Sequence, residues 1–436
     1  MKGISQLGST LSQRISRKNL IKVYAACQWW LGKEWLNQEK GTHPIQIMWQ
    51  NPNWASDTEL YLIGYSILHL RKQGHKRTDF DGKKTEILGK QSSNQNGYIF
   101  ELLVSTLFSE NKYKVQLLPP SAQGYDLDIT TSKGIEMQVS CKVCLPSDNY
   151  YAFESYSKDI ENKFIQAQKD YNVTGWTLTS QVNRIDSFPT LEQIEFMFGA
   201  NIERYFKQQK PTEFVCSDNY YSFKHRLPTI TGTQGYSLNN ISYDYTSVFD
   251  FSPDNELSRI DRIIKKANAK FKYVSKLNKK NFTVIKIPRY LDITNVCEYF
   301  LMRFKNNYSS TSGIIFLQTH ILYDPTKDGL ILNTTVEAIY NLNGQFPWNS
   351  NESLDFVIPI GSVSNISPKL VVGNKTEKIK MKLQNKYVYQ NTVESYLIKS
   401  ANNISPSNAP GLTRIFELND SDIINTQKIP FDLTLI

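Results

Sequence analysis

The stretch GYDLDITTSKGIEMQVSCKV, residues 124–143, contains two strand-like segments separated by a short turn. In the second segment, apolar and polar residues alternate from Ile135 to Val143. A period of two predicts a β-strand with one apolar and one polar face. The polar face carries four side chains: Glu136, Gln138, Ser140 and Lys142.

The length of the turn decides what lies opposite this polar face. A three-residue turn at 132–134 contains a glycine, which is common in hairpins. It places Asp128 opposite Gln138 and Asp126 opposite Ser140. A two-residue turn would move both aspartates to the apolar face, where an unpaired carboxylate is costly. We therefore predict the three-residue turn.

This register gathers a polar cluster on one face of the hairpin. Lys142 lies one diagonal step from Asp126, a separation of about 7–8 Å. The predicted cluster consists of Asp126, Asp128, Gln138, Ser140 and Lys142. We interpret it as a candidate site for phosphodiester hydrolysis. Carboxylates hold Mg²⁺ or Mn²⁺ through hard oxygen ligands, and the metal neutralises phosphate charge and lowers the pKa of a bound water. A nearby lysine orients that water or stabilises the developing charge.

A helix is expected just before the hairpin, over residues 97–110. Phe100, Leu103, Val104, Leu107 and Phe108 give it an apolar stripe. Glu101 lies at the edge of that stripe, so its carboxylate either reaches solvent or points into a site. A strand is expected next, over 114–118.

This order of a helix with Glu101, Asp126 at a strand start and Lys142 at the end of the next strand resembles the PD-(D/E)XK nuclease superfamily. The resemblance covers 97–143 and extends weakly over 254–345. It implies that Asp126 binds the metal, that Lys142 is the catalytic lysine and that Glu101 assists the metal. The departure is Ser140, where the family usually has an acid. Either Glu101 or Asp128 supplies the second carboxylate for the metal, or the protein keeps the nuclease fold but no longer cleaves nucleic acid.

The resemblance and the strand–helix alternation after residue 254 predict the fold class. We expect an α/β protein with a restriction-endonuclease-like mixed sheet flanked by helices. The expected divisions are a basic helical N-terminal domain over 1–96, a nuclease core over 97–345 with an insertion at about 173–250, and a β-rich region over 346–436. Tryptophans crowd the N-terminal region, and we interpret them as core residues of that domain rather than as a surface for stacking bases.

The charge distribution favours an anionic partner. The chain has a net charge of +9, and residues 1–96 hold 14 Lys/Arg against 7 Asp/Glu. We expect DNA first, with RNA still open. Residues 71–97 read as an exposed loop, either a solvated connector or a segment that contacts phosphates. Its candidate contact residues are Arg71, Lys72, Lys76, Arg77, Lys83 and Lys84.

Other features narrow the alternatives. Five cysteines, an odd number, and no apolar leader favour a reducing cytoplasm over a secreted protein, and no segment reads as a membrane span. The pair Cys141 and Cys144 lacks further ligands at zinc-site spacing, and no phosphate-binding Walker loop is present. Restriction or anti-phage defence is an expectation by analogy with the superfamily. The alternatives are an inactive nuclease-fold subunit that binds nucleic acid or a protein partner, and an assembly protein whose basic N-terminal domain docks on an acidic partner. Association with a partner protein or with a second copy of the chain is left open.

Overall fold

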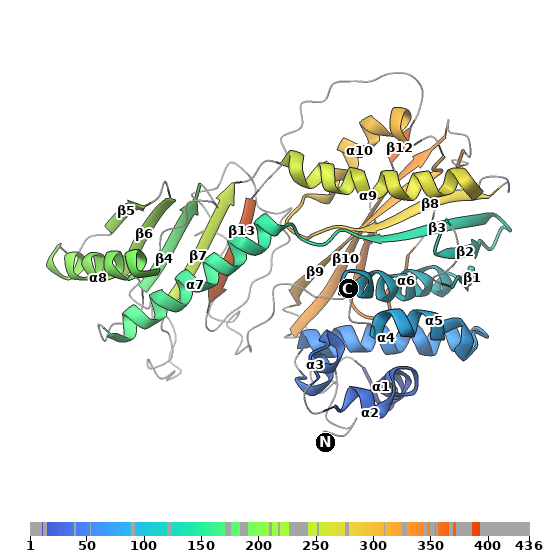
Figure 1. Cartoon of the computed structure of the whole chain (residues 1–436), viewed down its shortest axis with the longest axis horizontal. Helices are drawn as coiled ribbons and strands as arrows, with labels where there is room; N and C mark the ends of the chain where they lie inside the picture. Colours follow the sequence, from blue (N-terminus) through green and yellow to red (C-terminus); the bar gives the residue numbers. More distant parts are fainter. Residues whose placement is uncertain are drawn as a thin grey trace.

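The computed structural model describes the parts of the chain that build two sheets and their covering helices (Figure 1). These parts are residues 11, 15–38, 41–52, 54–88, 92–119, 124–170, 176–183, 191–208, 212–216, 219–225, 243–250, 253–274, 279–308, 310–324, 329–342, 347–348, 354, 356–365, 369–371 and 386–392.

The larger sheet is mixed and has the strand order β1-β2-β3-β8-β9-β10-β11, with β12 also paired to β10. Its strands are β1 (Lys114–Leu117), β2 (Leu127–Thr130), β3 (Glu136–Val143), β8 (Lys280–Lys286), β9 (Gly313–Asp324), β10 (Gly329–Asn341), β11 (Ser362–Asn365) and β12 (Lys369–Val371). β1, β2 and β3 are antiparallel, whereas β3, β8 and β9 are parallel to one another. The expected mixed α/β architecture is confirmed.

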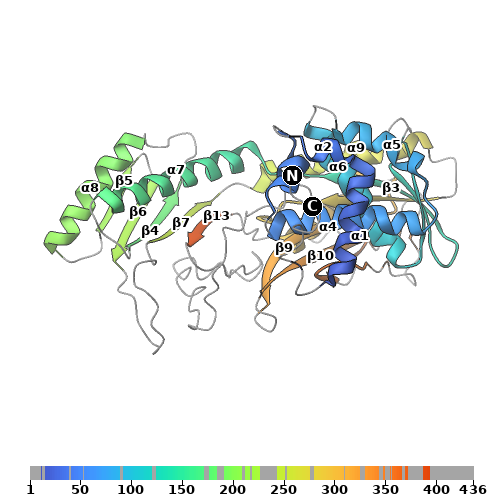
Figure 2. The same ribbon diagram turned by 90° about the horizontal axis from the view of Figure 1, so that it is seen from below.

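One face of this sheet is covered by the N-terminal helices (Figures 1 and 2). They are α1 (Arg17–Leu31), α2 (Lys33–Leu36), α3 (Pro44–Gln50), α4 (Trp54–Lys72), α5 (Arg77–Leu88) and α6 (Ser92–Glu110). A continuous hydrophobic cluster joins Trp30 of α1 and Trp49 of α3 to Val139 of β3. The interpretation of these two tryptophans as core residues is confirmed. α1 approaches α4 closely at Gly64, where a Cβ atom would lie 2.3 Å from the carbonyl oxygen of Val23.

The expected exposed loop over residues 71–97 is wrong. α4 continues to Lys72, α5 follows from Arg77 to Leu88, and α6 already begins at Ser92. The apolar stripe of α5 is sparse, because only Phe80 and Ile87 are buried apolar residues, with Lys83 between them on the same face. A helix whose inward face carries a lysine looks like a polar connector in the sequence.

The other face of the larger sheet packs against two helices, α9 (Pro253–Val274) and α10 (Ile293–Asn307). α7 (Asp148–Asp170), which follows the hairpin in the chain, begins beside this sheet and runs away from it (Figure 1). The apolar residues Leu257, Ile260 and Ile264 of α9 are buried in a second hydrophobic cluster with Ile285 of β8 and Phe316 of β9. The central strands are therefore covered on both faces.

The segment read as an insertion forms most of a second sheet, with the order β13-β7-β4-β6-β5. Its elements are β4 (Trp176–Val182), α8 (Leu191–Gln208), β5 (Thr212–Cys216), β6 (Asn219–His225), β7 (Tyr243–Asp250) and β13 (Lys386–Thr392). α7 extends from the larger sheet to this one (Figures 1 and 2), and its Tyr156 hydroxyl contacts that of Tyr221 on β6. Most of the β-rich region expected over 346–436 lies outside the described residues.

Across the described helices, none combines the length and the apolar character that crossing a membrane requires.

Candidate active site

The β2–β3 hairpin has the predicted register. Asp128 pairs with Gln138, and the amide of Asp126 donates to the carbonyl of Val139. Gly134 in the turn has a φ of 82°, a conformation that glycine adopts without strain. The three-residue turn, predicted from the cost of burying unpaired carboxylates, is confirmed, and Asp126 lies beside Ser140.

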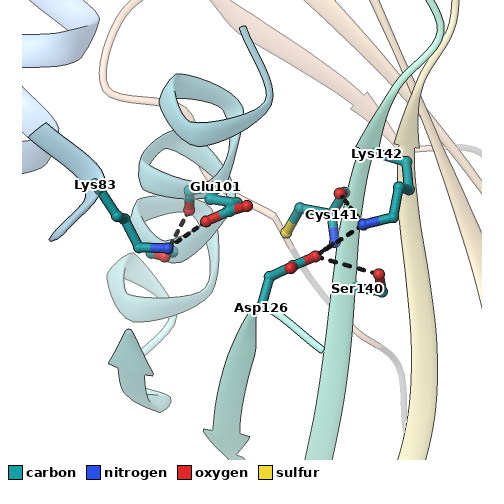
Figure 3. A network of polar contacts seen from close by, with 7 residues as sticks. Lys83, Glu101, Asp126, Ser140, Cys141 and Lys142 are labelled. Carbon is teal, nitrogen blue, oxygen red and sulfur yellow. Dashed lines mark hydrogen bonds and ion pairs between the residues drawn. The ribbon is translucent and has the colours of Figure 1, made fainter. Parts of the chain in front are cut away.

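Asp126 lies just before β2 and is held by three donors from β3 (Figure 3). Its Oδ2 atom accepts hydrogen bonds from the Cys141 amide at 2.7 Å, from Lys142 Nζ at 3.1 Å and from Ser140 Oγ at 3.2 Å. The other carboxylate oxygen, Oδ1, has no hydrogen-bond partner among the described residues. One oxygen thus fixes the side chain, and the other is left for a ligand.

Glu101 projects from α6 towards the same place and is buried. Its Oε2 atom accepts a hydrogen bond from the ammonium group of Lys83 on α5, which is only 2% exposed. Burial raises the pKa of Glu101 to about 7, and the charge of Asp126 adds to this, although Lys83 and Lys142 act in the opposite direction. At neutral pH this carboxyl group is therefore close to its titration midpoint.

A cavity of about 360 Å³ joins these groups. Both carboxyl groups line it, and so do three lysines: Lys83, Lys142 and Lys270 of α9. Two acids beside three cations suit an anionic substrate that is bound together with a cation. Tyr98, one turn before Glu101 on α6, closes the cavity beside Lys83, whose Nζ lies 5.7 Å from the centre of the tyrosine ring.

Asp128 and Gln138 do not line this cavity. The Asp128 carboxylate is ion-paired with Lys279 at 3.0 Å and accepts a hydrogen bond from the Tyr125 hydroxyl at 3.3 Å. Gln138 is buried, and its Nε2 atom has no hydrogen-bond partner among the described residues. Of the two alternatives for a second carboxylate, Glu101 lines the cavity with Asp126 and Asp128 does not.

The basic residues expected to contact phosphates divide into two groups. Arg71, Lys72, Lys76 and Arg77 are exposed and Lys84 is half-buried, so all five reach the surface. The guanidinium groups of Arg71 and Arg77 lie 3.9 and 5.5 Å from the centre of the Trp29 ring. Lys83 differs from them, because it is buried inside the protein as the partner of Glu101. Its assignment to an exposed phosphate-contacting loop is wrong.

The oxygen atoms around the cavity fit a hard divalent cation. Mg²⁺ is usually held by one or two carboxylates and keeps several waters. Glu101 and Asp126 supply two carboxylates, while the carbonyl of Cys141 accepts from Lys142 Nζ at 2.8 Å. The described residues contain no group of three or more His, Cys, Asp or Glu side chains that could hold a metal ion. A site here consequently depends on two carboxylates and water.

Zinc is a poor match for the neighbouring cysteines. Both Cys141 and Cys144 are buried free thiols. Burial raises the pKa of the Cys144 thiol to about 12, and the pKa of Cys141 also lies well above its ordinary value. Zinc binds the thiolate form, which these surroundings oppose.

Two charged residues of the cavity, Lys83 in its buried role and Lys270, were not predicted from the sequence. Lys83 had a usable signal, because it occupies the position between Phe80 and Ile87 that an apolar stripe would fill. A lysine at a core position is rarely tolerated unless it is paired. Lys270 had no such signal, since it lies on the exposed side of an amphipathic helix.

No known protein family, no curated protein and no solved structure matches this chain. The function of the site is therefore inferred from its own residues.

Proposed function

We propose that this protein is a Mg²⁺-dependent nuclease that hydrolyses phosphodiester bonds in DNA. One observation carries the proposal: Glu101, Asp126 and Lys142, brought by three different elements, meet at one cavity. An acid pair can hold a divalent metal ion, and a lysine at its edge can stabilise the charge that develops on the phosphate.

The order of elements around the site supports a restriction-endonuclease-like core. A helix, α6, precedes the antiparallel strands β1, β2 and β3. β8 and β9 then extend the sheet in parallel to β3, with α10 between them in the chain. This arrangement agrees with the resemblance of residues 97–143 to the PD-(D/E)XK superfamily. The second sheet and the N-terminal helices are additions to that core.

The residues of the cavity have separable roles in this proposal. A bound Mg²⁺ would neutralise charge on the scissile phosphate and acidify a water molecule. Glu101 and Asp126 would hold it through their free oxygens. The ammonium group of Lys142 has three N–H donors. Two of them contact Asp126 and the Cys141 carbonyl, which leaves one for a water or a phosphate oxygen. Lys270 adds positive charge at the rim.

The surface of α4 and α5 supplies a binding region for the phosphate backbone. Arg71, Lys72, Lys76 and Arg77 are exposed there, and a basic surface of this kind binds nucleic acid without reading its sequence. DNA is the proposed substrate, with RNA as the comparison in the test. A cytoplasmic location agrees with the free thiols of the described cysteines. A role in restriction or anti-phage defence rests on analogy alone.

The test is cleavage of plasmid DNA and of a matched RNA with Mg²⁺ or Mn²⁺. We expect wild type to cut DNA and Asp126→Asn to be inactive. The control variant is Lys279→Met, because Lys279 forms an ion pair of similar length in the same sheet and does not line the cavity. Equal cleavage by wild type and Asp126→Asn would refute the site. Cleavage of RNA alone would change the substrate class.

A second candidate function is an inactive nuclease-fold subunit that binds nucleic acid. The observation that favours it is Ser140, which is fully buried and uses its hydroxyl to hold Asp126 where the family has an acid. This alternative predicts binding that weakens steeply with salt and no cleavage with either metal.

A further inference from the structure

Lys83 occupies a position that is unusual for a lysine. It lies on the buried face of α5 between Phe80 and Ile87 and is 2% exposed. Its ammonium group contacts Glu101 Oε2 and faces the ring of Tyr98. Burying an ammonium group removes its hydration, which is costly unless strong partners replace the water. A lysine that only packed between helices would extend its charge to solvent.

Lys369 of β12 shows how a structural lysine behaves in the same protein. Its Nζ atom lies 3.2 Å from Glu298 Oε1 and 3.9 Å from Glu337 Oε2, so it bridges two carboxylates. Lys369 is nevertheless 21% exposed, and none of these three residues lines the cavity. It ties β12 to α10 and β10. Lys83, in contrast, has its charge enclosed at the cavity wall.

Each carboxylate of the cavity already has a lysine as its ion-pair partner. Glu101 is paired with Lys83, and Asp126 is paired with Lys142. Each carboxylate has one oxygen engaged by its lysine and one, Glu101 Oε1 or Asp126 Oδ1, without a hydrogen-bond partner among the described residues. Two free oxygens can serve one divalent ion. A second ion at Glu101 would meet the ammonium group of Lys83, which already occupies that side of the carboxylate.

We propose that Lys83 is the fixed counter-ion of Glu101 and replaces a second divalent cation, so that the centre takes a single ion held by Glu101 and Asp126. The inference rests on the proposed metal-dependent function and specifies its metal stoichiometry. Lys83 acts through Glu101 and is therefore a positioning residue. Its charge fixes the Glu101 carboxylate at the cavity and weakens the attraction of that carboxylate for further cations.

The experiment is calorimetric titration of Mn²⁺ into the full chain in mildly alkaline buffer, with the bound ions counted by electron paramagnetic resonance. Wild type should bind one ion per chain. Lys83→Met should bind Mn²⁺ at least about tenfold more tightly, because a unit positive charge near the ion has been removed. Lys83→Arg keeps the charge and should behave as wild type. Lys369→Met is the matched control and should also bind as wild type.

Several outcomes would overturn the inference. Two bound ions in wild type would do so whether or not Lys83→Met folds. Unchanged or weaker Mn²⁺ binding by a folded Lys83→Met variant would show that Lys83 has only a structural role. Mn²⁺ binding by Lys83→Arg that differs from wild type would show that shape rather than charge matters.

A plasmid-cleavage measurement on the same samples separates this inference from the proposed function. Tighter Mn²⁺ binding by Lys83→Met with no cleavage by wild type would support the counter-ion and refute the nuclease. Mg²⁺-dependent cleavage by wild type without the affinity change would support the nuclease and refute the counter-ion. Absence of Mn²⁺ binding in every variant would refute both.

Discussion

Two aspartate–lysine ion pairs lie close together at the β2–β3 hairpin and are nearly identical as ion pairs. Asp126 and Lys142 are 3.1 Å apart with 18% and 22% of their side chains exposed, and Asp128 and Lys279 are 3.0 Å apart with 23% and 18% exposed. Distance and burial do not distinguish them. The first pair lines the cavity beside Glu101, whereas the second does not.

The two pairs differ in the direction and the surroundings of their carboxylate groups. Asp126 receives the backbone amide of Cys141 at the end of β3, where the cavity opens, and keeps one oxygen free. Asp128 lies two residues further along β2, and both its oxygens are engaged, one by Lys279 and the other by the Tyr125 hydroxyl. An ion pair therefore indicates a site only when it leaves a ligand position open next to a cavity.

Replacing the two lysines one at a time is the most direct test of whether the two ion pairs differ in function. Lys142→Met should lower the rate of metal-dependent cleavage by about 100- to 1,000-fold, as expected for losing a charge-stabilising group at the reacting centre. Lys279→Met should leave the rate within about twofold of wild type, since a pair of this exposure contributes little energy. Initial rates on supercoiled plasmid measure both. Similar losses in the two variants would mean that Lys142 acts through stability.

Replacing each aspartate should also have a different effect on the stability that a bound Mg²⁺ adds to the folded protein. Mg²⁺ that binds only the folded protein adds about 2.7 kcal/mol of stability at a concentration a hundred times its dissociation constant. We expect this gain in wild type and in Asp128→Asn, and its loss in Asp126→Asn. Thermal unfolding with and without Mg²⁺ measures it. A gain that disappears in Asp128→Asn instead would reassign the second ligand from Glu101 to Asp128.

The hairpin was predictable from the sequence because period-two alternation and the cost of burying unpaired carboxylates together leave one register. The helices α6 and α9 were predictable for a similar reason, since each has a continuous apolar stripe. The elements that surround the hairpin were not predictable from the sequence. α5 looked like a loop because Lys83, the middle one of its three inward residues, is charged, and only its partner in the folded protein, Glu101, explains a lysine at that position.

The second sheet shows another limit of sequence reasoning. β7 pairs with β13, although more than a hundred residues separate them in the chain. Short strands rich in Tyr, Ser and Thr carry little periodic signal, and the pairing partner of a strand is decided by tertiary packing. The different surroundings of Asp126 and Asp128 were hidden for the same reason, because both belong to the polar face of one hairpin.

Glu101 should make the stability of the protein depend on pH. Its pKa is raised to about 7, mainly by burial and then by Asp126, whereas an unfolded glutamate titrates near 4.3. Between these values the folded state holds a proton that the unfolded state releases. The free energy of unfolding therefore falls as pH rises from about 4.3 to about 7, with a slope from this group of at most about 1.4 kcal/mol per pH unit.

Denaturant unfolding across this pH range checks the slope. Glu101→Gln should remove the contribution even though the variant is less stable overall, because Lys83 loses its charged partner. Glu298→Gln, at the Lys369 cluster, should keep the wild-type slope. Equal slopes in wild type and Glu101→Gln would show that the carboxyl group titrates at its ordinary value.

The smallest expected effect concerns the hydroxyl groups that hold each aspartate. Ser140 donates to Asp126 and Tyr125 donates to Asp128. Ser140→Ala should cost about 1 kcal/mol of stability and change cleavage by no more than about threefold, because Asp126 Oδ2 keeps the Cys141 amide and Lys142. Tyr125→Phe should cost a similar amount of stability. If Ser140→Ala instead lowers cleavage as far as Lys142→Met does, Ser140 takes part in the chemistry itself rather than in holding Asp126.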